Sequence, residues 1–209
     1  MLSIIQAAGW PIWPLIACSL TAFTLILERF TSLKTAKIAP ARLVDDAIAV
    51  SNMAVPPLEV VNQLAQSSLL GEVLSSGFRA VHANPHVSTE ELQATIEGAG
   101  RKAAHTMERY LAALATIASA APLLGLFGTV VGMIEIFGSQ GGSSSSSGSN
   151  PVQLAQGISI ALYNTAFGLM VAIPTLICWR YFRSRVDSFL LTMELASERF
   201  TRHLGSLRK

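Results

Sequence analysis

Three long segments of the chain carry almost no charged side chains. They run from Ile12 to Leu27, from Leu111 to Phe137 and from Val152 to Trp179. Small polar residues and Glu135 interrupt the second segment, whereas the third contains no Asp, Glu, Lys, Arg or His. A membrane-spanning helix needs about 20 mostly apolar residues, so the pattern predicts three transmembrane helices. The first is short by this measure, and we expect Trp10 and Trp13 to anchor it at the membrane interface.

The positive charges predict how these spans are oriented. If the N-terminus and residues 138–151 lie on one side, and residues 28–110 and 180–209 on the other, all 15 Lys and Arg residues fall on the second side. Positive residues favour the cytoplasmic side, so we expect an N-out, C-in topology. A cleaved signal peptide fits poorly, because MLSIIQAAGW has no Lys or Arg and the positive ERFTSLKTAK follows the apolar run.

The composition agrees with a membrane protein. Only 13% of the residues are charged and the mean hydropathy is +0.47, whereas a soluble domain has about 25% charged residues. The net charge of +2 therefore reflects orientation and not nucleic-acid binding. We expect Cys18 and Cys178 to lie roughly 15 Å or more apart along the membrane normal, too far for a disulfide, so both are packing residues. The sequence shows no metal-ligand spacing, nucleophile–base pair or phosphate loop, and we expect no cofactor, no metal and no enzyme activity.

The predicted fold is an all-α integral membrane protein whose long helices extend into a cytoplasmic helical region. In order, we expect a periplasmic segment with the first span (1–33), a cytoplasmic helical region (34–110), the second span (111–137), a periplasmic Gly/Ser loop (138–151), the third span (152–179) and a C-terminal amphipathic helix (180–209). Within the second region, LVDDAIAVSN, PLEVVNQLAQ and LGEVLSSGFRAVH predict short helices, and Ser88 or Thr89 can cap the next one.

Two longer patterns leave alternatives open. From Thr89 to Phe137 the strongest helix breaker is Pro122, which predicts one continuous helix of roughly 70 Å; the alternative is a break near Gly98–Gly100. The C-terminal segment repeats apolar residues at heptad spacing, which suits binding of partner helices or packing against the long helix of the same subunit, and both can hold in an oligomer. These apolar residues are Phe182, Val186, Phe189, Met193, Ala196 and Phe200.

Two predicted spans carry a face of small residues that would let helices approach closely. This face contains Gly125, Gly128 and Gly132 in the second span, and Gly157, Ala161 and Gly168 in the third. Asn164 and Thr165 belong to the small, weakly polar face of the third span, and Thr129 lies at one edge of that of the second; we expect these three residues to line a pore. Such faces can line a path, with Thr129 and Thr165 at similar depth. The alternative is that each hydroxyl bonds to its own helix.

Glu135 is the one carboxylate in the three predicted spans. A carboxylate within a membrane is usually functional. Glu135 lies two residues from the end of its span, however, where water makes ionisation cheap. Both an outer-mouth carboxylate of the path and an ordinary interface residue fit this position.

All three spans together resemble the ExbB/TolQ/MotA proton-channel family. WPLIACSLTAFTLILERFTSL resembles the first span of the ExbB and TolQ branch, APLLGLFGTVVGMIEIF the second and GISIALYNTAFGLMVAIPT the third. The predicted three-span topology also favours this branch over the four-span MotA branch. One departure is Ile160, at a position where the ExbB branch usually has a glutamate.

The resemblance implies a function and partners. It implies a homo-oligomeric ring in the bacterial inner membrane, typically a pentamer, around an ExbD- or TolR-like single-span partner whose aspartate carries protons. Proton flow would then drive work on a periplasm-spanning TonB- or TolA-like protein. The family's pore-facing threonines correspond to Thr129 and Thr165. The alternative function is a non-conducting membrane scaffold, and the coupling ion, H⁺ or Na⁺, stays open.

Overall fold

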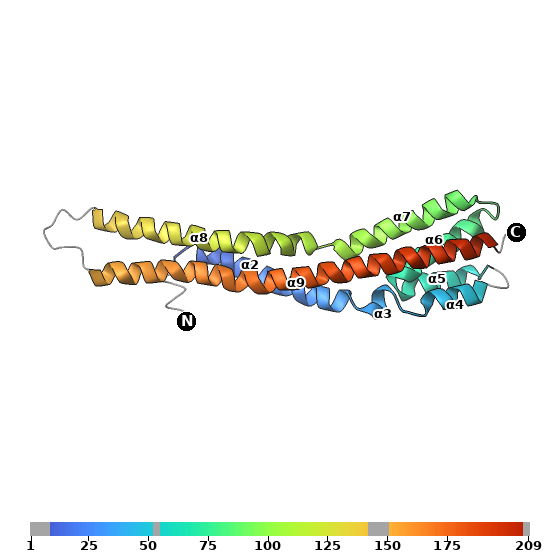
Figure 1. Ribbon diagram of the computed structural model, residues 1–209, viewed down its shortest axis with the longest axis horizontal. Coiled ribbons are helices and arrows are strands. Elements are labelled where there is room, and N and C mark those ends of the chain that lie inside the picture. Colours follow the sequence, from blue (N-terminus) through green and yellow to red (C-terminus); the bar gives the residue numbers. More distant parts are fainter. Residues whose placement is uncertain (1–8, 52–54, 142–150, 207–209) are drawn as a thin grey trace. The chain divides into compact units, whose positions relative to one another are not determined.

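A computed structural model describes residues 9–51, 55–141 and 151–206 of the chain (Figure 1). All regular elements within these ranges are helices, which confirms the all-α prediction. They are α2 (Ile12–Ser32), α3 (Thr35–Ile38), α4 (Leu43–Ser51), α5 (Leu58–Ser67), α6 (Leu69–Ala83), α7 (Thr89–Glu108), α8 (Leu111–Gly141) and α9 (Pro151–Ser206). The chain divides into two compact units. Unit 1 comprises Met1–Glu28 and Tyr110–Tyr181, and unit 2 comprises Arg29–Arg109 and Phe182–Lys209.

Unit 1 is built from the three apolar helices. Within the described residues, three helices are long and apolar enough to cross a membrane, as the sequence predicted. Leu15 of α2, Ala121 of α8 and Val171 of α9 form its buried core, together with Ala172. Trp10, just before α2, packs edge to face on Phe127 of α8, with ring centroids 5.8 Å apart. These contacts join all three apolar helices into one bundle.

The helix predicted to run unbroken from Thr89 to Phe137 is interrupted. The first part, α7, ends at Glu108, and α8 begins at Leu111. Tyr110 between them has a φ of 67°, in the left-handed region that side chains other than glycine rarely adopt. The alternative break near Gly98–Gly100 is wrong as well, because both glycines lie within α7. The sequence around the true break contains neither Pro nor Gly, so composition gave no signal for it.

Unit 2 has α6 at its centre. This helix packs against α5 and α7 and buries apolar side chains on several faces, among them Leu70, Val73, Leu74 and Phe78. The predicted helices at LVDDAIAVSN, PLEVVNQLAQ and LGEVLSSGFRAVH are confirmed as α4, α5 and α6. Ser68 caps α6 by accepting from the Gly71 amide, and Ser88 caps α7 by accepting from Glu91. The short α3 was not predicted.

The heptad residues of the C-terminal segment pack within this chain. Each of the six is at least nine-tenths buried. Phe182 stacks edge to face on Phe30, and Phe200 does the same on Phe78, with ring centroids 4.9 Å apart in both pairs. Packing within the same subunit therefore accounts for the burial of these six residues. These residues belong to α9, which continues without interruption from the third apolar segment.

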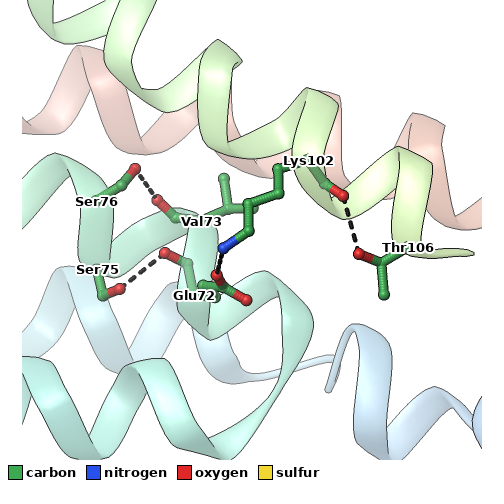
Figure 2. A network of polar contacts seen from close by, with 6 residues as sticks. All are labelled: Glu72, Val73, Ser75, Ser76, Lys102 and Thr106. Carbon is green, nitrogen blue, oxygen red and sulfur yellow. Dashed lines mark hydrogen bonds and ion pairs between the residues drawn. The ribbon is translucent and has the colours of Figure 1, made fainter.

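The surface of unit 2 carries ion pairs between helices. Figure 2 shows Lys102 of α7 reaching Glu72 of α6, with 2.8 Å between Nζ and Oε1. Nearby, the hydroxyls of Ser75 and Ser76 donate to backbone carbonyls of their own helix. The carboxylate and the ammonium are both exposed, and such pairs contribute about 1 kcal/mol or less. The buried apolar side chains therefore provide most of the stability of unit 2.

Two smaller sequence predictions concern unit 1. The segment 138–151 was expected to be a loop, but α8 continues through residues 138–141 and α9 begins at Pro151. The rest of this Gly/Ser segment, 142–150, lies outside the described residues. Cys18 and Cys178 are both free thiols, each partly buried.

Candidate functional site

The predicted small-residue faces of α8 and α9 pack directly against each other. A Cβ atom placed on Gly168 would lie 2.6 Å from the carbonyl oxygen of Ala121 and 3.1 Å from the Cα of Gly125. A carbon atom does not approach another carbon or an oxygen so closely. The backbones of α8 and α9 can therefore meet here only because Gly125 and Gly168 have no side chains. Figure 1 shows α8 running beside the N-terminal half of α9.

Further contacts along the two helices fix an antiparallel register. Gly128 faces Asn164, Gly132 faces Ala161, and Gly157 faces Ile136. The residue number rises along α8 as it falls along α9. Thr129 and Thr165 therefore lie at the same level of the helix pair, as the sequence predicted from their depth.

The two threonine hydroxyls have different surroundings. Thr129 Oγ1 donates a 2.6 Å hydrogen bond to the carbonyl oxygen of Leu126, so for this residue the self-bonded alternative describes the structure. Thr165 Oγ1 is buried, and within the described part of the chain it has no hydrogen-bond partner. Buried hydroxyls are nearly always paired, so the unpaired hydroxyl of Thr165 distinguishes it as a functional candidate.

Thr129 also borders a shallow concavity on the outer side of α8. Its lining is Thr129, Val130, Met133, Ile134, Phe137 and Gly138. Among the described residues, the lining is apolar apart from the Thr129 side chain and lies on α8. Apolar side chains thus surround the Thr129 hydroxyl in this concavity. The sequence did not predict that these apolar residues belong to the site. Their helical spacing was visible in the sequence but was indistinguishable from that of lipid-facing residues.

Glu135 and Asn164 occupy opposite environments. Glu135 is exposed on α8 and does not line the concavity beside Thr129. Asn164 is only 1% exposed and lies within the α8–α9 contact against Gly128. Their predicted roles, at the outer mouth and along the path, stay predictions. The close pairing of Gly128 with Asn164 was not predicted, because one sequence does not show which residues face each other.

The outward faces of unit 1 are strongly apolar. On α8 and α9 they include Leu123, Leu126, Ile134, Leu162, Met170, Ile173 and Ile177, each more than half exposed. Apolar surfaces this extensive on a single chain mark a contact with a membrane or with another protein. Among the described residues, no group of three or more His, Cys, Asp or Glu side chains could hold a metal ion. The fold and the site together define a multi-pass α-helical membrane protein.

Comparison with known proteins gives its family. A profile of the MotA/TolQ/ExbB proton channel family matches residues 65–195, which is more than half of the chain. The chain belongs to this family. The match includes α8, most of α9, and therefore Thr129, Asn164 and Thr165.

Individual relatives agree on the branch. The ExbB-like 3 biopolymer transport protein of Synechocystis is 31% identical over 182 residues, covering 86% of this chain and 83% of its own. The biopolymer transport protein exbB1 of Vibrio cholerae is 29% identical over 81% and 73% of the two chains. The Tol-Pal system protein TolQ of Pseudomonas aeruginosa is 27% identical over 84% and 78%. The chain is thus a transport-energising membrane protein of the ExbB/TolQ branch.

Proposed function

We propose that this chain is a proton-channel and stator subunit of the bacterial inner membrane. Several copies, five by resemblance, form a ring around an ExbD- or TolR-like partner with an aspartate in its single span. Proton flow through the ring moves the partner, which does mechanical work on a periplasm-spanning TonB- or TolA-like protein. The observation that carries the proposal is the buried, unpaired hydroxyl of Thr165 in a family member with three apolar helices.

The charge distribution supports an N-out, C-in orientation for this function. Unit 1 contains Arg180 as its one Lys or Arg, and the other 14 of the 15 belong to unit 2. In this orientation unit 2 is cytoplasmic and Glu135 lies near the periplasmic end of α8.

The hydroxyls of Thr129 and Thr165 support a path at their shared level. A hydroxyl can both donate and accept a hydrogen bond, so it can pass a proton or orient a water without becoming charged. Thr165 Oγ1 is buried without a partner in the described part of the chain, and its unused hydrogen-bonding capacity suits a water or a carboxylate supplied by another polypeptide.

The titrating carboxylate of the path is supplied by the partner. Third-span residues 152–179 include no Asp, Glu, Lys, Arg or His, and Ile160 stands where the ExbB branch usually has glutamate. This chain therefore provides hydroxyls and a small-residue packing surface, while the partner's aspartate gains and loses the proton.

The decisive experiment is proton transport by the reconstituted complex. The chain is co-purified with an ExbD- or TolR-like single-span protein from the same organism and placed in liposomes containing a pH-sensitive dye. An imposed pH gradient should cause dye-reported proton entry, which should fall to the level of empty liposomes when the partner's Asp is replaced by Asn. A complex that forms but conducts neither H⁺ nor Na⁺ would instead establish the scaffold function.

A further inference from the structure

Asn164 is a polar side chain enclosed at a helix–helix contact within unit 1. Its exposed fraction is 1%, and it faces Gly128 across the α8–α9 pair. A Cβ atom on Gly128 would lie 2.8 Å from Cβ, 2.9 Å from Cγ and 2.9 Å from Nδ2 of Asn164. Carbon–carbon and carbon–nitrogen contacts of this length are repulsive, so the Asn164 side chain fills the space that the missing Gly128 side chain leaves.

The neighbouring contacts along the pair involve apolar or backbone atoms. Gly125 faces the backbone of Asn164 and Thr165, and Gly132 faces the methyl group of Ala161. The Gly128 contact differs from these because it encloses a polar side chain. Rotation of α9 would move the Asn164 amide against apolar side chains of α8, which is costly without water. Enclosed amides fix helix register in this way in coiled coils.

The orientation of Asn164 has a direct consequence for Thr165. Successive residues of an α-helix differ by about 100° around its axis, so fixing the Asn164 side chain against Gly128 also fixes the direction of the Thr165 hydroxyl. We propose that Asn164 is a positioning residue that sets the rotation of α9 against α8 and thereby orients the hydroxyl of Thr165. The inference about rotation stands without ion conduction, whereas its consequence for transport rests on the proposed function.

Disulfide cross-linking can report the register directly. A Cβ atom placed on Gly132 would lie 3.1 Å from the Cβ of Ala161, close to the separation of about 3.5–4.5 Å in a disulfide. The chain carrying Gly132→Cys and Ala161→Cys, with Cys18 and Cys178 changed to Ser, should therefore cross-link within one chain in oxidant-treated membranes. Intramolecular cross-linking is read from gel mobility before and after reduction.

The test adds Gly128→Ala to this cysteine pair, with and without Asn164→Ala. Gly128→Ala alone should slow cross-linking at least fivefold, and Asn164→Ala in addition should restore most of the rate by making room for the new methyl group. Gly138→Ala is the matched control, because a Cβ there meets no atom of the described residues within 4 Å and should leave the rate unchanged. An unchanged rate in Gly128→Ala, or no rescue by Asn164→Ala, would overturn the inference.

Two further readouts keep the result interpretable. If Gly128→Ala prevents accumulation in the membrane, the amount of protein in the membrane is measured in place of the cross-linking rate. Failure of Asn164→Ala to restore that amount would equally count against the inference. In the liposome assay with the partner, the same variants without added cysteines should lose and regain proton flux in parallel with cross-linking. If no variant or parent conducts protons, the proposed function fails, while the cross-linking result still decides the role of Asn164.

Discussion

Arg29 in the last turns of α2 donates a 3.0 Å hydrogen bond from Nη1 to the carbonyl oxygen of Met107 in the last turn of α7. The final carbonyls of a helix lack partners within it, and a cation there also interacts favourably with the helix dipole. Arg29 is only 3% exposed, so this bond is shielded from water. It stabilises the end of α7 two residues before the interruption at Arg109 and Tyr110.

Replacing Arg29 with Ala should destabilise the protein by about 2 kcal/mol, because a buried carbonyl loses a charged donor. Arg29→Lys should recover part of this loss, since it keeps the charge but not the planar donor geometry. Chemical unfolding in detergent, followed by circular dichroism, provides the measurement. Equal stability of Arg29→Ala and the parent chain would show that the bond contributes nothing.

The left-handed conformation of Tyr110 gives a second prediction. Asn tolerates a positive φ, whereas a β-branched residue does not. Tyr110→Val should therefore be less stable than Tyr110→Asn by about 1–2 kcal/mol, although both lose the aromatic ring. The same unfolding assay compares the two variants, and a more stable Val variant would mean that the φ of 67° is not adopted in the membrane.

The proposed path predicts that the two hydroxyls act together. Thr129→Val combined with Thr165→Val keeps the side-chain shape but removes both hydroxyls, and should abolish proton flux while the oligomer persists. Of the single variants, Thr165→Val should be the more severe, since Thr129 already donates to its own helix. Liposome flux and size-exclusion chromatography report the two properties, and full flux in the double variant would remove both residues from the path.

Glu135→Gln should reduce proton flux only mildly, by about threefold or less. Glu135 is exposed and lies away from the level of Thr129 and Thr165, so its charge acts on ion entry and not on transfer through the path. The effect should shrink at high salt, where charges are screened. Complete loss of flux in Glu135→Gln would instead make this carboxylate part of the path.

The packing of the C-terminal heptad predicts a contrast between two positions of α9. Phe200 is 0% exposed and stacks on Phe78, so Phe200→Ala should destabilise unit 2 by about 3–5 kcal/mol. Leu195 is 58% exposed, and Leu195→Ala should change stability by about 0.5 kcal/mol or less. Unfolding in detergent measures both. Dissociation of the oligomer by Phe200→Ala without loss of fold would revive the partner-helix interpretation.

The sequence predicted which segments form helices better than it predicted where each helix ends. The length of the uncharged apolar segments identified all three spans, and cap residues such as Ser88 marked a true helix start. The interruption at Tyr110 escaped prediction because its residues are compatible with a helix. Near this interruption the structure depends on tertiary contacts, since the buried Arg29 bond to Met107 joins residues 78 positions apart in the chain.

The candidate site was predictable only in part, because it too depends on contacts between segments that are distant in the sequence. Helical periodicity placed Thr129, Asn164 and Thr165 on two small-residue faces, and the positions of Thr129 and Thr165 in their spans predicted a similar depth. It could not show that Asn164 enters the helix contact while Thr129 borders an exposed concavity, because that depends on the rotation of each helix. Rotation follows from the fit of Gly128 to Asn164, which is a property of two segments together.

This fit has a consequence for how the sequence can diverge. Position 128 can acquire a side chain only in a lineage where position 164 has already become small, since both cannot occupy the same space. Substitutions at the two positions should therefore be ordered in time, and across relatives their side-chain volumes should be anticorrelated. Gly138, which has no described neighbour within 4 Å of a Cβ position, should vary without reference to the third span.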